Sequence, residues 1–103
     1  MQKIRLTDDQ LDRIKKCFRL CFLDKDHLWI FGSRVKPEKK GGDIDLYIET
    51  TYATAEEVVE ARLRFLVMLE KELGEQKIDV VVKFEDYELL IHQIAKEEGI
   101  KLV

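Results

Sequence analysis

Apolar residues along the chain follow two kinds of spacing, one typical of helices and the other of strands. Spacings of three and four residues predict helices over about 8–23, 55–73 and 86–97. Short continuous or alternating apolar runs predict strands over about 27–31, 43–49 and 77–84, with a short final strand over about 100–103. Helices and strands therefore share the chain, which indicates a fold of the α/β (α+β) class.

Polar residues mark the expected ends of the two longer helices. Thr7 with Gln10 three residues later has the form of a capping box, and so does Thr54 with Glu57. Gly74 is well placed to end the second of these helices, because glycine adopts the backbone angles that follow a last helical turn.

The helix expected over 55–73 is apolar on more than one side. Its main stripe consists of Val58, Ala61, Phe65, Leu69 and Leu73. Val59, Leu63 and Val67 spread round to another side, and a helix with two apolar sides is buried on two sides. Either the second side receives a partner, such as a second copy of this chain in a homo-oligomer, or the helix is wedged between the sheet and the first helix.

Composition narrows the class of protein. The 103 residues, 46% apolar and 38% charged, suit one small domain spanning 1–103. The net charge of -3 argues against a broadly basic nucleic-acid binder, so no nucleic-acid partner is expected. The start of the chain is polar, and no run approaches the roughly 20 apolar residues of a membrane span. We therefore expect a cytoplasmic protein without a membrane partner.

Residues that often bind metals have ordinary structural explanations here. Cys17 and Cys21 lie among apolar residues of the first helix, which favours two core residues over a metal site or a disulfide. His27 stands at the start of a strand and His92 on a helix, and we expect both to be structural or surface residues.

Three aspartates carry the candidate chemistry. Asp43 and Asp45 share one face of their strand and lie about 7 Å apart, because each residue rises roughly 3.4 Å. Asp79 interrupts a β-branched run, and it would join the pair if its strand lay alongside in register. Carboxylates this close repel one another, and Mg²⁺ relieves the repulsion. Two such ions could drive in-line phosphoryl displacement, with Asp79 as a third ligand and base.

A Gly-Ser turn at the end of the preceding strand has a matching role. Gly32 would let backbone amides approach a phosphate, and the Ser33 hydroxyl would add a donor. Arg34 and the lysines of the loop over 32–42 would neutralise a triphosphate. Taken singly, a Gly-Ser turn or an Asp-x-Asp strand is common in proteins, so the prediction depends on their combination.

The combination resembles the signature of a known family. Phe31-Gly32-Ser33, nine residues, and Asp43-Ile44-Asp45-Leu46 are similar to the motif of the DNA polymerase β-like nucleotidyltransferase superfamily. Ile78-Asp79-Val80 resembles its third acidic motif, and the short length is similar to the minimal nucleotidyltransferases. The resemblance implies a small mixed sheet of three to four strands, with helices packed mainly on one face.

The resemblance also implies an activity. It implies Mg-dependent transfer of a nucleoside monophosphate from a nucleoside triphosphate, expected to be ATP, to a hydroxyl, with pyrophosphate leaving. By position, Asp43, Asp45 and Asp79 would be catalytic and bind two Mg²⁺ ions, and Gly32, Ser33 and Arg34 would bind the nucleotide. The acceptor hydroxyl is expected on a HEPN-type toxin, because minimal nucleotidyltransferases are often the antitoxin partners of HEPN-domain proteins.

Two other functions stay open at this point. The chain could be a non-catalytic antitoxin that masks a partner toxin sterically, which its small size and two-sided helix favour. It could also modify a small molecule, as antibiotic nucleotidyltransferases do, although no second domain is expected to build the acceptor pocket. Tyr47 shares the face of the aspartates and would either stack on a nucleotide base or pack in the ordinary way.

Overall fold

The computed structural model describes residues 6–35, 43–84 and 89–103. In these ranges the elements, in chain order, are α1 (Asp8–Cys21), β1 (His27–Phe31), the 3-10 helix η1 (Gly32–Val35), β2 (Ile44–Glu49), α2 (Ala55–Leu73), β3 (Ile78–Lys83), α3 (Leu90–Glu98) and β4 (Ile100–Lys101). The bounds agree with the sequence-based prediction within about two residues at every end but one. The predicted start of the last helix, at about 86, lies outside the described residues, and the helix as described begins at Leu90.

The strands form one mixed sheet in the order β3-β2-β1-β4. β1 pairs antiparallel with both β2 and β4, whereas β2 pairs parallel with β3. A parallel pair requires a crossover connection, and α2 supplies it. The observed sheet confirms the predicted α+β class.

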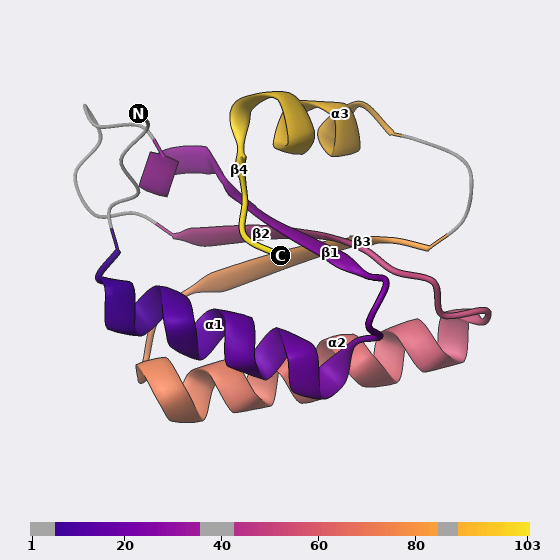
Figure 1. Cartoon of the computed structure of the whole chain (residues 1–103), viewed down its shortest axis with the longest axis horizontal. Coiled ribbons are helices and arrows are strands. Elements are labelled where there is room, and N and C mark those ends of the chain that lie inside the picture. The colour runs from indigo at the N-terminus through magenta and orange to yellow at the C-terminus, as the bar shows by residue number, and fades with distance from the viewer. Residues whose placement is uncertain (1–5, 36–42, 85–88) are drawn as a thin grey trace.

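Helices cover both faces of the sheet unequally. α1 and α2 pack together under one face, and α3 lies across the other (Figure 1). The prediction that helices pack mainly on one face is therefore confirmed, with α3 as the exception. Because both faces of β1 and β2 are covered, Leu28, Trp29, Ile30 and Phe31 are all buried, without the alternation of a half-exposed strand.

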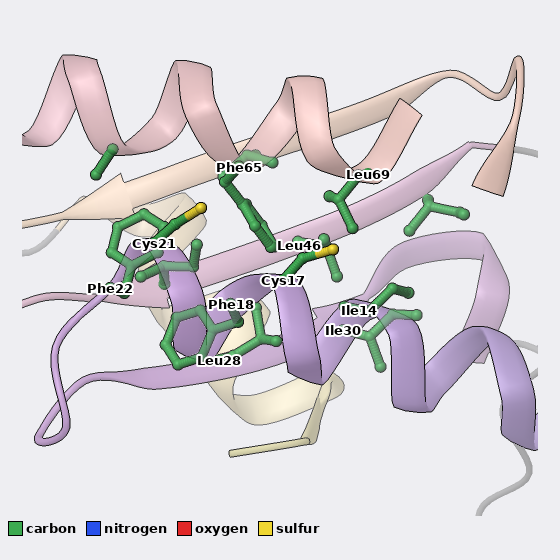
Figure 2. Close-up of a cluster of buried hydrophobic side chains, with 14 of the residues drawn as sticks. Ile14, Cys17, Phe18, Cys21, Phe22, Leu28, Ile30, Leu46, Phe65 and Leu69 are labelled. Atoms are coloured by element: carbon green, nitrogen blue, oxygen red, sulfur yellow. The ribbon is translucent and has the colours of Figure 1, made fainter. Parts of the chain in front are cut away.

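The larger core lies between the sheet and the α1–α2 pair. Figure 2 shows Phe65 and Leu69 of α2 meeting residues of α1 above the strands. Cys17 and Cys21 are buried free thiols within this core, as the sequence predicted. Burial raises the pKa of both thiols, so they remain protonated and unreactive at neutral pH.

A smaller core lies between the sheet and α3. The ring of Tyr47 stacks on that of His92 at 5.4 Å between centroids, with Trp29 on the same face. The Tyr47 hydroxyl donates a 2.7 Å hydrogen bond to Glu49, and its side chain is fully buried. Tyr47 therefore packs in the ordinary way and is not exposed for stacking on a base. His92 accepts a hydrogen bond from the Leu89 amide, which confirms a structural role.

The helix ends follow the expected chemistry. Thr7 and Gln10 exchange hydrogen bonds in a capping box, as do Thr54 and Glu57. Gly74 has a positive φ of 80° and ends α2. None of the helices in the described ranges combines the length and the apolar character needed to cross a bilayer.

A buried aspartate ties together two turns at one end of the sheet. Asp26 is 1% exposed, and its carboxylate accepts hydrogen bonds from the Leu23 amide, the Thr50 hydroxyl, and both the amide and the hydroxyl of Thr51. The α1–β1 turn is thereby fastened to the β2–α2 turn. Since His27 pairs with Glu49, this anchor lies at the opposite end of the sheet from Asp43.

Candidate active site

The site begins where β1 ends at Gly32. This glycine has a φ of +77°, which non-glycine residues rarely adopt. A Cβ at this position would overlap the carboxylate of Asp45. The lack of a side chain at Gly32 therefore makes room for a carboxylate, whereas the sequence had suggested that it makes room for a phosphate.

The parallel pairing of β2 with β3 brings the acids together. Asp45 and Asp79 are direct partners in the register, so their side chains leave the sheet on the same face. Neighbouring strands lie about 4.8 Å apart, which makes the two carboxylates immediate neighbours. Asp43 lies two residues before Asp45, and its charge acts on Asp45 as that of Asp79 does.

Electrostatics single out Asp45 among the three. Its partial burial, then the charges of Asp79 and Asp43, raise the pKa of Asp45, and Lys77 opposes them. The Asp45 carboxylate forms no hydrogen bond or ion pair with any other side chain in the described part of the chain. A carboxylate held in this way is destabilised until a cation reaches it.

Asp43 already has a cationic neighbour. Lys77 Nζ lies 3.5 Å from Asp43 Oδ2, and both side chains are substantially exposed. The sequence analysis gave Lys77 no functional role. The signal was nevertheless there, because Lys77 precedes Asp79 by two residues and therefore shares its strand face.

The residues predicted to bind phosphate stay a prediction. Ser33 and Arg34 follow Gly32 in the backbone of η1, directly beyond β1. The side chains of Ser33 and Arg34, and the loop lysines Lys36, Lys39 and Lys40, lie outside what the structure describes. Their proposed contacts with a triphosphate therefore remain predictions.

The donor set matches a hard divalent cation in its chemistry. Carboxylate oxygens are the ligands that Mg²⁺ prefers, and Asp45 is a crowded carboxylate beside a glycine that leaves it space. As the side chains stand, no three His, Cys, Asp or Glu residues within 6–35, 43–84 and 89–103 form a group that could hold a metal ion. The donor atoms therefore suit a divalent cation chemically, but the side chains must rearrange before three of them can hold it.

The mixed sheet carries acids on two parallel strands beside a glycine turn. This arrangement indicates a protein of the class that transfers nucleotidyl groups. A family model described as "Nucleotidyltransferase domain" matches residues 11–102, so the chain belongs to this family and is a nucleotidyltransferase. The match implies a nucleoside triphosphate as donor. Comparison with individually curated proteins gives no match.

Replacing Gly32 by Ala tests the fit between the turn and Asp45. The added Cβ overlaps the Asp45 carboxylate, and the positive φ becomes strained, at a cost of roughly 1–3 kcal/mol. Because a displacement of about 1 Å can reduce a rate by about 100-fold, we expect nucleotidyl transfer to fall by about that factor. Stability is measured by urea unfolding and activity by transfer of label from a nucleotide.

Gly74→Ala is the matched control. Gly74 has nearly the same φ of +80°, but a Cβ there meets nothing within 4 Å. This variant should lose similar stability and keep its activity. Equal loss of activity in both variants would show that backbone strain, and not contact with Asp45, is responsible.

Replacing Asp45 by Asn tests the crowding of charge. In the folded chain the pKa of Asp45 is raised, so its ionised form costs stability above that pKa, and the cost disappears below the ordinary value of 3.8. At pH 7, with a chelator present, the variant should therefore melt about 2–5 °C higher than the wild type. The difference should shrink as the pH falls towards 4.

Asp43→Asn serves as the comparison, because it removes the same charge together with the ion pair to Lys77. It should give a smaller gain in melting temperature or none. If Asp45→Asn melts no higher than the wild type at pH 7, the carboxylates do not repel one another as the geometry implies.

Proposed function

We propose that this chain is an active, Mg²⁺-dependent nucleotidyltransferase that transfers AMP from ATP to a hydroxyl acceptor. The observation that carries the proposal is the register of β2 and β3, which sets Asp79 beside Asp45 at the glycine turn. Family membership supports the general reaction. Asp43, Asp45 and Asp79 are the proposed catalytic and metal-binding residues, and Gly32, Ser33 and Arg34 the proposed nucleotide-binding residues.

The chemistry follows from these positions. Bound Mg²⁺ ions, two in the proposed site, would neutralise phosphate charge and orient the reacting oxygens. The acceptor oxygen attacks the α-phosphorus, the bond from that phosphorus to the bridging oxygen breaks, and pyrophosphate leaves. Asp79, exposed at the start of β3, would accept the hydroxyl proton. The amides of Gly32 and Ser33 and the guanidinium of Arg34 would hold the phosphates.

The acceptor that we propose is a hydroxyl on a partner protein, for instance a tyrosine of a HEPN-type toxin. The likeness of the motifs to those of minimal nucleotidyltransferases supports this choice. A cytoplasmic location accords with ATP as the donor. Modification of a small molecule, such as an aminoglycoside, is a weaker proposal that the same assay would detect.

Transfer of label from ATP tests the reaction. The purified chain is incubated with Mg²⁺ and ATP labelled at the α-phosphate, with and without the protein encoded by the neighbouring gene. We expect label on the acceptor, and no label when ATP carries it at the γ-phosphate, because pyrophosphate leaves. Asp45→Asn and Asp79→Asn should each reduce transfer by about 100-fold or more.

Asp24→Asn is the matched control, since it removes an exposed acid near the opposite end of the sheet. It should transfer label like the wild type. Absence of transfer from a folded wild-type chain under both conditions would refute the proposal, and transfer of γ-label would indicate a kinase instead.

A specific observation favours a second function, steric masking of a partner. On the outer side of α2, Val59 and Leu63 are 65% and 61% exposed, and Val67 is 45% exposed. The first two line an apolar hollow of about 470 Å³ that Glu56 and Glu60 border. The idea that this side is wedged against α1 is therefore wrong, and the partner or homo-oligomer interpretation of the helix stands as a proposal.

Leu63→Glu separates binding from catalysis. If masking is what matters, this variant should fail to neutralise the partner, whereas the doubly substituted Asp43→Asn, Asp45→Asn chain should still neutralise it. Leu90→Glu, an equally drastic change at an exposed leucine of α3 on the other face of the sheet, is the control. Light scattering of the same variants shows whether α2 joins two copies. Neutralisation that survives Leu63→Glu would argue against this surface.

A further inference from the structure

We propose that Lys77 is a built-in counter-ion of the acid site, which a divalent cation must displace from Asp43 before the site can assemble. The inference rests on the proposed function, because it concerns the same metal-binding carboxylates. It assigns a role to a residue that neither the sequence motifs nor the family match identifies.

Strand pairing places Lys77 at the site. The Ile44 amide donates a 3.0 Å hydrogen bond to the Lys77 carbonyl, so the lysine lies across from the start of β2. Ile44 pairs with Ile78 in the register, and Asp43 and Lys77 are the residues just before each. The 3.5 Å contact between Asp43 Oδ2 and Lys77 Nζ is therefore a cross-strand pair.

The lysine influences more than its direct partner. It lies on the same strand face as Asp79, and its charge opposes the effect of the other acids on Asp45. One ammonium thus partly balances a cluster of three carboxylates while no metal is bound. Lys77 does not fully offset the other contributions. Burial and the neighbouring acids still raise the pKa of Asp45, which disfavours its ionised form.

The ion pair between Lys77 and Asp43 is also weak enough for a divalent cation to replace the lysine. The side chains of Lys77 and Asp43 are 72% and 42% exposed, and exposed ion pairs contribute little because water and salt screen them. A divalent cation interacts with the same carboxylate through twice the charge.

A displaced Lys77 has acceptors close by. It lines a cavity of about 520 Å³ at the turn from α2 to β3, together with Glu70 and Glu75. These carboxylates would offer the displaced ammonium other acidic groups near the site.

Binding of Mn²⁺ alone to the full chain tests the proposal without relying on activity. Free Mn²⁺ is measured by electron paramagnetic resonance at low ionic strength for the wild type, Lys77→Gln and Lys77→Arg. Lys77→Gln should bind Mn²⁺ about three- to tenfold more tightly, because the competing charge is gone. Lys77→Arg keeps the charge and should stay within about twofold of the wild type.

Lys25→Gln is the matched control, because it removes the same charge in the turn before β1, at the other end of the sheet. It should leave Mn²⁺ affinity within about twofold of the wild type. Equal tightening in Lys25→Gln would overturn the proposal, since net charge alone would then explain the effect. Unchanged or weaker binding by Lys77→Gln would overturn it as well.

The outcomes distinguish this inference from the proposed function. If the wild type binds Mn²⁺, Asp45→Asn abolishes that binding and label transfer is observed, the proposed function stands whatever Lys77→Gln does. If no variant binds Mn²⁺, both the metal-dependent reaction and the role of Lys77 are overturned. Urea unfolding of each variant shows that the exposed substitutions leave the fold intact.

Discussion

Repulsion between carboxylates on two parallel strands is the constraint around which the site is built. Asp45 and Asp79 stand in register, Asp43 lies two residues before Asp45, and Gly32 leaves space for the Asp45 carboxylate beside β1. Such an arrangement costs stability in the isolated chain, and functional sites commonly carry costs of this kind. The charge crowding that weakens the fold is also what would make a divalent cation bind.

Aspartates at the two ends of the sheet have opposite environments. At one end Asp26 is buried and accepts four hydrogen bonds, which join two turns. At the other end the Asp45 carboxylate has other acids as its neighbours and forms no hydrogen bond with a side chain in the described ranges. The hydrogen bonds of Asp26 can hold the strands in place at one end, while the carboxylates at the other end remain available to a ligand. α3 packs on one face of this sheet, where His92 and Ala95 meet Tyr47.

Much of this arrangement was predictable from local patterns. Periodicity and the Thr7 and Thr54 capping boxes located the first two helices, and the alternation around Asp43 and Asp45 indicated which face the acids share. The register of β2 with β3 could not be read from either strand, because it depends on how α2 returns the chain. For that reason the pairing of Lys77 with Asp43 was not predicted, although the spacing of Lys77 and Asp79 pointed to one strand face. The environment of Tyr47 was also open, since it depends on where α3 docks.

The crossover connection through α2 affects the order in which the site can form during synthesis. Asp45 and Asp79 are neighbours in space, but a 19-residue helix and two turns separate them along the chain. During synthesis the first acidic motif leaves the ribosome well before the second, and parallel pairing must wait for the intervening helix. A nascent or truncated polypeptide that ends before β3 would carry two of the three proposed ligands, without the third beside them. The active site would therefore form late, when β3 pairs with β2 and completes the sheet.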